Sequence, residues 1–339
     1  MKILLFTVLF AVALSATASP TERWLDPECF AENRAPMRTS FIVFPTASEA
    51  VPENDYTRSP FYRTLNGEWS FLRVDRPGAE PEGFFRSGHD DSSWGTMPVP
   101  GIWELNGYGD PVYTNKPYPW YKFFEVKPPL VPHEQNYTGL YRRTVRVPAD
   151  WKGRDAFIHI GSATSNVTLW VNGREAGYNE DSKNPAQYRI DPLLRPGENT
   201  LALKMTRWST GSYLEAQDFW RISGIERTVY LSAETPDALR DFEVVSTLDD
   251  SYRTGLFTLK MFLAGDREVE AGYELLDPEG RTVASGRQQA TGEALFRAEI
   301  PDAAHWTAET PDRYRLVMHV RTPERTVYVP FSVGFRRFE

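Results

Sequence analysis

The chain has 339 residues, of which 41% are hydrophobic and 25% charged, so it is long enough for two domains and ordinary in composition for a globular protein. Its 38 basic and 46 acidic residues give a formal net charge of −8, and no run of Lys or Arg occurs. This balance excludes the basic surface of a nucleic-acid-binding protein. The 10 Trp favour contact with carbohydrate, although many of them are expected in the core.

Residues 1–18 have the features of a secretory signal peptide. A basic Lys2 precedes an apolar run at residues 3–14, and Ala16-Thr17-Ala18 is a small-residue cleavage site. The run is shorter than the roughly 20 residues that span a membrane, so cleavage is favoured over anchoring. Cys29 is the only cysteine, which excludes an internal disulfide. We expect an exported bacterial protein, periplasmic or on the cell surface, with no membrane span after signal cleavage.

Residues 19–60 are polar and rich in proline, which predicts an extended N-terminal arm rather than a domain. From residue 61 the pattern becomes all-β, with a turn at Asn66-Gly67 after which a first strand is expected. Residues 92–120 combine Pro, Gly and aromatic side chains and predict a long irregular stretch.

Short strands at regular spacing are predicted from residue 139 onward. Asn172-Gly173 is a strong hairpin signal, and residues 201–206 alternate apolar and polar side chains as in a half-buried strand. A β-sandwich over residues 61–234 accounts for this pattern. A boundary is predicted near Pro236, and residues 235–339 hold about seven further strands, the size of an immunoglobulin-like sandwich. The predicted fold class is therefore all-β, with two successive sandwiches.

Residues 207–227 lie between two predicted strands and fit neither a strand nor a helix. They include two Trp, one Tyr and one Phe together with Glu, Gln and Asp side chains. A structured loop of this length is usually functional, and aromatic faces beside amide and carboxylate groups suit a sugar. The composition equally allows these aromatics to cover the end of the sandwich.

Several ordered blocks of the sequence resemble the N-terminal part of the β-galactosidases of glycoside hydrolase family 2. The most specific block is Tyr-Leu-Glu-Ala-Gln-Asp-Phe-Trp at residues 213–220, within a longer match at residues 211–225. The other blocks are at residues 65–69, 107–115, 136–141, 169–178, 306–314 and 333–336. The resemblance implies a jelly-roll (galactose-binding-like) sugar-binding domain at residues 61–234 and an immunoglobulin-like domain at residues 235–339.

In that family a third domain, a (β/α)₈ barrel, carries the two catalytic glutamates of a retaining β-galactosidase. The sequence stops at Glu339, where the barrel would begin, so the resemblance assigns no catalytic residue to this chain. It implies two substrate-binding residues, Asn115 and Asp218, and makes Asp218 one ligand of a partial sodium site. The family's magnesium ligands lie mostly in the barrel. For Asp218 the alternative is a salt bridge to Arg207 or Arg221, and for Asn115 a turn residue that caps its own loop.

The resemblance predicts the non-catalytic portion of an enzyme that hydrolyses terminal β-D-galactosides when it is joined to a catalytic barrel. Its expected partners are the galactoside and a separately encoded catalytic domain or further copies of the chain. A stand-alone carbohydrate-binding or interaction module without catalysis is the alternative. A different family 2 specificity, glucuronidase or mannosidase, is disfavoured by the block at residues 213–220 and by the long N-terminal arm.

Overall fold

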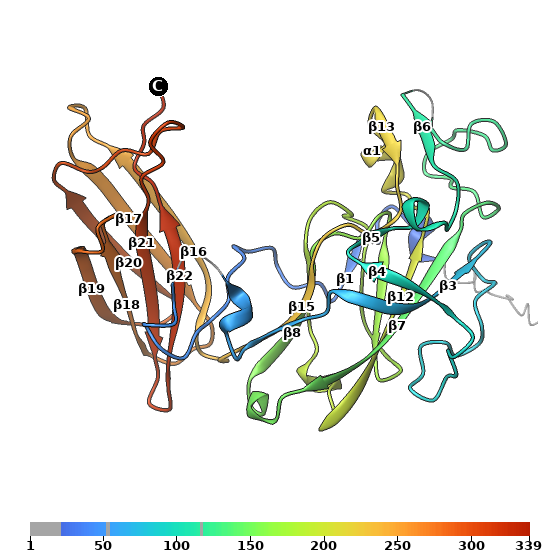
Figure 1. The fold of residues 1–339 in the computed structure, drawn as a ribbon, viewed down its shortest axis with the longest axis horizontal. Coiled ribbons are helices and arrows are strands. Elements are labelled where there is room, and N and C mark those ends of the chain that lie inside the picture. Colours follow the sequence, from blue (N-terminus) through green and yellow to red (C-terminus); the bar gives the residue numbers. More distant parts are fainter. Residues whose placement is uncertain (1–21, 52–54, 116–117) are drawn as a thin grey trace, which may run out of the picture.

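A computed structural model describes residues 22–51, 55–115 and 118–339, and it consists of two β-sandwiches in succession (Figure 1). The predicted all-β fold class, a jelly roll followed by an immunoglobulin-like sandwich, is confirmed. The signal predicted at residues 1–18 lies outside the described residues. In the described part of the chain, no helix combines the length and the apolar character that crossing a membrane requires.

The jelly roll packs a seven-stranded sheet against a four-stranded sheet, and every strand pair in both sheets is antiparallel. The larger sheet has the order β1 (Ala31–Glu32), β10 (Arg174–Asn179), β9 (Val167–Val171), β12 (Gly197–Thr206), β7 (Thr138–Val147), β3 (Gly67–Val74) and β4 (Gly95–Val99). The smaller sheet has the order β11 (Ala186–Arg189), β8 (Asp155–Ile160), β15 (Val229–Glu234) and β2 (Tyr62–Thr64).

Strand alternation builds the core between these sheets. Leu201, Leu203 and Met205 of β12 are fully buried, as the period-two pattern predicts. The opposite face of β12 is also covered, because Ala202 is buried in a second cluster that contains Phe84 from the loop between β3 and β4. The predicted hairpin forms between β9 and β10, and its Asn172 and Gly173 both have positive φ, at 52° and 82°.

The irregular stretch predicted at residues 92–120 proves to contain three short strands: β4, β5 (Gly101–Ile102) and β6 (Val112–Thr114). The proline in β4 and the one that follows it obscured the strand pattern. Proline removes a ladder hydrogen bond and is tolerated on an edge strand, and β4 is the edge of the seven-stranded sheet. The stretch also holds one of the single-turn 3₁₀ helices, which lie at Arg23–Leu25, Tyr56–Arg58, Trp103–Asn106, Ala149–Trp151 and Asp191–Leu193.

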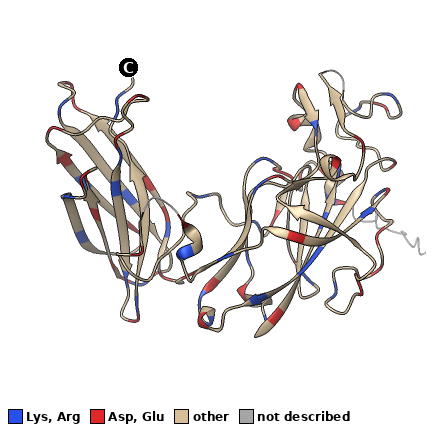
Figure 2. Ribbon diagram, in the orientation of Figure 1, with Lys and Arg blue, Asp and Glu red and all other residues tan. Residues whose placement is uncertain are grey.

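The second sandwich contains seven strands in sheets of three and four, the number expected for an immunoglobulin-like domain. One sheet has the order β16 (Leu239–Leu248), β17 (Gly255–Leu263) and β20 (Glu293–Ile300). The other has the order β19 (Thr282–Ala290), β18 (Val269–Leu276), β21 (Tyr314–Arg321) and β22 (Thr326–Val333). Acidic and basic residues are interspersed over both sandwiches (Figure 2).

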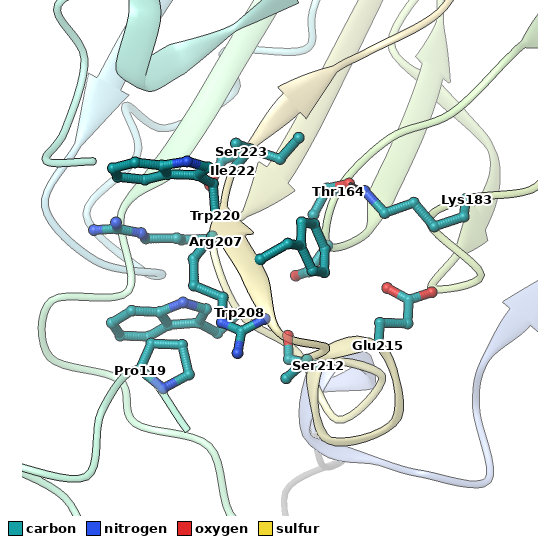
Figure 3. Close-up of a pocket in the computed structure, with 14 residues that line it drawn as sticks. Pro119, Thr164, Lys183, Arg207, Trp208, Ser212, Glu215, Trp220, Ile222 and Ser223 are labelled. Carbon is teal, nitrogen blue, oxygen red and sulfur yellow. Dashed lines mark hydrogen bonds between the residues drawn. The ribbon is translucent and has the colours of Figure 1, made fainter. Parts of the chain in front are cut away.

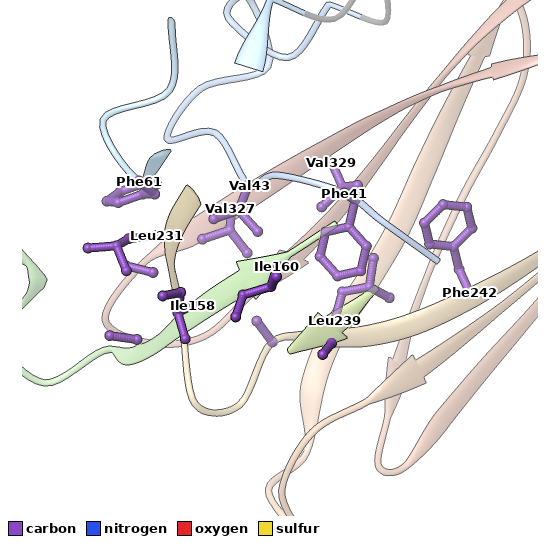
Figure 4. Close-up of a cluster of buried hydrophobic side chains, with 14 of the residues drawn as sticks. Phe41, Val43, Phe61, Ile158, Ile160, Leu231, Leu239, Phe242, Val327 and Val329 are labelled. Carbon is purple, nitrogen blue, oxygen red and sulfur yellow. The ribbon is translucent and has the colours of Figure 1, made fainter. Parts of the chain in front are cut away.

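The N-terminal arm links the two sandwiches. It adds strand β1 to the jelly roll, and further on Phe44 pairs through both backbone hydrogen bonds with Tyr328 of β22, at 2.8 and 2.9 Å. Between these points Phe41 and Val43 are buried with residues of both sandwiches (Figure 4). The buried apolar side chains of the two domains consequently form one connected cluster.

A buried ion pair anchors the arm at the same junction. Arg38 of the arm bonds the carboxylate of Glu234 at the end of β15, and both side chains are less than 10% exposed. Arg38 also donates to the carbonyl of Arg240 at 3.0 Å. Burial raises the pKa of Glu234, and the neighbouring Arg38 opposes that rise.

Replacing Arg38 with Met is expected to lower the free energy of unfolding by up to about 3–5 kcal/mol at neutral pH, because the buried Glu234 would keep only the more distant Arg240, 4.0 Å from its carboxylate. Equilibrium unfolding in urea measures the loss. Without Arg38 the pKa of Glu234 rises further. Above the usual carboxyl range, the unfolded variant releases the proton of Glu234 while the folded variant retains it, so unfolding becomes more favourable as pH rises. The difference in unfolding free energy between the variant and the wild type should therefore become smaller at acidic pH.

Two further variants separate this pair from surface effects. Arg253→Met breaks the exposed pair with Asp302 and should change stability by less than about 0.5 kcal/mol. The double change Arg38→Met with Glu234→Met should recover most of the loss, since no unpaired buried charge remains. Equal losses for the single and double variants would contradict the role assigned to the pair.

Candidate functional site

The loop at residues 207–227 folds against the loop around β6 at one end of the jelly roll (Figure 1). It contains a one-turn helix, α1 (Ser212–Glu215), and two short strands, β13 (Phe219–Arg221) and β14 (Gly224–Ile225). The prediction that this segment has neither helix nor strand was therefore wrong in detail. Both strands pair with partners about 100 residues earlier, β6 and β5, so the local pattern could not reveal them.

The ribbon formed by β6 and β13 brings the two sequence-predicted residues together. Its register pairs Phe219 with Thr114, and continuing it by one position sets Asp218 opposite Asn115. Both side chains are exposed. Asp218 accepts a hydrogen bond from the hydroxyl of Tyr113 at 2.7 Å, and this contact raises the pKa of Tyr113.

The salt bridge considered for Asp218 does not form among the described residues. Arg221 instead donates to the carbonyl of Thr114 at 2.8 Å and to that of Gln217. Arg207 donates to the carbonyl of Asp110 at 2.7 Å and lies 3.9 Å from the carboxylate of Glu104. Within the described chain, Asp218 therefore presents a carboxylate to solvent, held by one tyrosine hydroxyl.

A small pocket of about 40 Å³ lies behind the ribbon and is lined by Trp208, Phe219 and Ser223, among others (Figure 3). Arg207 and Ser223 also line this pocket. The Nε of Arg207 and the hydroxyl of Ser223 are buried, and neither atom has a hydrogen-bond partner within the described protein. A volume of this size holds a few water molecules and no sugar ring. This pocket itself therefore cannot enclose a saccharide.

Three carboxylates that the sequence did not single out hold the loop in place. Glu180 accepts bonds from the hydroxyl of Thr210 at 2.7 Å and the backbone N–H of Gly211 at 2.9 Å. Glu215 accepts bonds from the backbone N–H of Ser182 at 2.9 Å and from the same residue's hydroxyl. The third, Glu104, accepts the backbone N–H of Ser223 at 3.0 Å.

Burial raises the pKa of all three carboxyl groups, and their hydrogen bonds act in the opposite direction. Raised carboxyl pKa values are common at catalytic sites, but buried structural networks produce them as well. Here each carboxylate is bonded to backbone or hydroxyl groups of its own domain. Their role in the described structure is to position the loop.

The outer surface of this end carries apolar side chains. Leu214 of α1 is 83% exposed and Trp220 of β13 is 57% exposed. Trp220 lies with its ring centre 5.7 Å from that of Tyr113, so two exposed aromatic rings flank Asp218. Further exposed apolar residues of the same loops are Leu105, Tyr121, Phe123, Val126 and Leu130. Exposed apolar groups gathered in this way mark a surface that binds a ligand or another protein domain.

The same surface offers only part of a cation site. Sodium prefers several oxygen ligands, and Asp218 supplies one carboxylate beside Tyr113. Among the described residues, no group of three or more His, Cys, Asp or Glu side chains is arranged to hold a metal ion. The residues present fit a sodium site only as one wall of a larger one.

Both sandwiches match models of one protein family. Residues 62–236 match the family model described as "Glycosyl hydrolases family 2, sugar binding domain", and residues 238–336 match that described as "Glycosyl hydrolases family 2". The chain belongs to glycosyl hydrolase family 2.

Relatives of known name include β-galactosidases from Priestia megaterium and Halalkalibacterium halodurans. The first is 34% identical over 96% of this chain and 33% of its own length, and the second is 35% identical over 93% and 32%. The chain thus spans about a third of the length of the relatives it matches.

Solved structures show the same fold at lower identity. A β-glycosidase from Bacteroides vulgatus superposes with a TM-score of 0.61 and 20% identity, covering 82% of this chain and 34% of the other. A β-glucuronidase from Ruminococcus gnavus superposes with a TM-score of 0.63 and 19% identity, covering 82% of this chain and 46% of the other. At this identity the likeness establishes the fold alone.

Replacing Asp218 with Asn should lower the pKa of Tyr113 toward the ordinary tyrosine value, because the negative charge that stabilises its protonated hydroxyl is removed. Tyrosine ring carbon NMR shifts followed against pH measure this change, and Tyr113→Phe assigns the resonance. The exposed Asp75→Asn, elsewhere on the jelly roll, is the matched control and should leave the pKa of Tyr113 unchanged. An unaltered pKa in Asp218→Asn would contradict the contact.

Proposed function

We propose that this chain is the non-catalytic, sugar-binding portion of a β-galactosidase that hydrolyses terminal β-D-galactosides when joined to a catalytic barrel. The observation that carries the proposal is the match of nearly the whole chain to one third of several β-galactosidases. A retaining glycosidase needs two carboxylates about 5 Å apart at the scissile bond. In the described structure, Glu180 and Glu215 are tied into the loop by hydrogen bonds, and Asp218 is exposed beside a tyrosine.

In this proposal the ribbon of β6 and β13 is one wall of the galactose site. Asn115 and Asp218 contact sugar hydroxyls, and Asp218 also contributes one ligand to a sodium ion whose other ligands come from the barrel. The exposed apolar groups Leu214 and Trp220 are then buried by the sugar or by the barrel. Figure 1 supports this arrangement, since the C-terminus lies at the same upper side of the molecule as β6 and β13. A domain joined after Glu339 would begin on the side of the ribbon.

The proposal also includes export to the periplasm or cell surface, directed by residues 1–18, and assembly with a separately encoded barrel or with further copies of the chain. N-terminal sequencing of the protein recovered from its native host tests the export, and a mature terminus near residue 19 is expected. Size-exclusion chromatography with light scattering, with and without a barrel fragment, tests the assembly.

The chain alone should not hydrolyse 2-nitrophenyl β-D-galactoside above the buffer rate, because the proposal places the paired catalytic carboxylates in the barrel. The full-length P. megaterium β-galactosidase serves as the positive control under the same conditions. Turnover by the purified chain that survives further purification would overturn the non-catalytic assignment.

A chimera tests the roles of the site residues. This chain replaces the matching third of the P. megaterium β-galactosidase, and galactoside hydrolysis is measured with and without sodium. Asp218→Asn should lower kcat/KM by roughly 10- to 100-fold, the effect of losing a hydrogen bond to a charged group, and should weaken the response to sodium. Asp75→Asn should behave as the unmodified chimera. Equal kcat/KM and an equal sodium response in both variants would remove Asp218 from the site.

The exposed pair of Tyr113 and Trp220 favours a second candidate function, a stand-alone carbohydrate-binding module. Calorimetry with galactose and lactose, with and without sodium, distinguishes the two. A wall of an incomplete site should bind with a Kd of about 1 mM or weaker, whereas a self-sufficient module should bind more tightly and lose affinity in Trp220→Ala.

A further inference from the structure

A second and much larger pocket has a volume of about 740 Å³ and is lined by residues at the end of β7 and the beginnings of β8 and β12. These strand ends lie at the opposite end of the jelly roll from β6 and β13 (Figure 1). Three connections form its walls: the turn between β7 and β8, the segment between β11 and β12, and the linker at Pro236. Its volume lies in the range of about 300–1,000 Å³ that is typical of small-molecule sites. Nothing in the proposed galactosidase function uses this pocket.

The pocket carries more positive than negative charge. Lys152, Arg154, Arg189 and Arg195 line it, against two acidic residues, Asp155 and Asp191. Arg189 engages both of these carboxylates, at 2.7 and 2.8 Å. Lys152, Arg154 and Arg195 form no ion pair with any described residue. Arg189 balances only one of these two negative charges, and the lining of the pocket as a whole keeps a net charge of +2 (4 − 2).

The side chain of Arg154 has a hydrogen-bond donor without a partner. Its Nε is buried and has no hydrogen-bond partner within the described protein, and its one polar contact is a long 3.4 Å bond to the hydroxyl of Thr235. The guanidinium lies 3.8 Å from the ring centre of Phe61. Burial, with a smaller contribution from nearby Arg325, lowers the pKa of Arg154 to about 10. Arg154 is half-buried and has no hydrogen-bonded anion among the described residues, and only the more distant charge of Asp150 acts to stabilise its cationic form. A partly desolvated cation in this position is poorly compensated.

An oxyanion is the ligand group that would complete this environment. A carboxylate or phosphate accepts two parallel hydrogen bonds from a guanidinium, which is the geometry that arginine offers best. Lys152 and Arg195 are exposed at the rim, where they would attract an anion and bond to its polar substituents. Apolar side chains, including Trp151 and Leu194, line the same pocket and can contact the body of the ligand.

We propose that this pocket binds an oxyanion, a carboxylate or a phosphate, carried on a body of about disaccharide size, with Arg154 as the direct partner of the anion. The site is separate from the ribbon of β6 and β13 and does not depend on the galactosidase proposal.

Calorimetry on the chain at low salt tests the proposal with three probes. Digalacturonic acid presents a carboxylate on a disaccharide, lactose is a neutral disaccharide, and inorganic phosphate is an anion without a body. Binding of either anion is expected, and the tighter of the two identifies an acidic saccharide or a phosphate ester as the ligand class. The proposal would be overturned if neither anion bound at about 10 mM. It would also be overturned if lactose bound and Arg154→Met weakened its binding as much as it weakens that of the anions.

Variants locate the binding at Arg154. Arg154→Met should lower the affinity for the anionic probe at least about tenfold, because it removes the charged donor while keeping an unbranched apolar chain over Phe61. Its Tm should equal or exceed that of the wild type, because an unpartnered buried N–H is removed. Arg253→Met, which removes the same charge from the other sandwich, should retain wild-type affinity.

Two outcomes would refute the assignment of Arg154. Unchanged affinity in Arg154→Met would place the anion elsewhere. A Tm lowered by more than about 5 °C would show that the guanidinium stabilises the free protein, contrary to the unfavourable burial inferred for it.

Discussion

The ion pair between Arg38 and Glu234 lies where the arm, the jelly roll and the second sandwich meet. Both side chains are buried, so separating them would leave a charge in a medium of low polarity. Separating the arm from the junction would therefore cost free energy, and Phe41 and Val43 remain buried with the residues of both sandwiches. This constraint makes the two domains one unit. It also fixes the direction in which the jelly roll presents its loops relative to the C-terminal strand.

The sequence predicted those parts of the fold that depend on local patterns. The hairpin at Asn172 and Gly173 requires positive φ at two adjacent positions, and Asn followed by Gly is the residue pair that favours this conformation. Strands such as β12 were evident because apolar side chains alternate over several residues. Strands β4 and β13 were missed. Strand β4 contains a proline, which is tolerated because β4 lies at the edge of its sheet. Strand β13 forms by pairing with β6, which lies about 100 residues earlier in the sequence.

The candidate site was predictable to a similar extent. Resemblance to a family selected Asn115 and Asp218, and the ribbon register explains why residues so distant in sequence belong to one surface. The buried Glu180 and the partly buried Glu215 could not have been found, since a glutamate that faces solvent and one that is withdrawn from it look alike in a sequence. Their partners, Gly211 and Ser182, lie about 30 residues away, and only the folded chain brings them together.

The two ends of the jelly roll treat buried charge in opposite ways. At the loop end, Glu180 and Glu215 accept hydrogen bonds from backbone and hydroxyl donors that hold the loop in place, and Leu214 and Trp220 of the loop are exposed. At the opposite end, Arg154 is half-buried with an orphaned Nε in an open, cationic pocket. A satisfied network needs no ligand to explain it, whereas an unsatisfied cation lowers the stability of the free protein. We therefore propose that the first end serves as a preformed wall for another domain, and that the second is completed when an anion enters it.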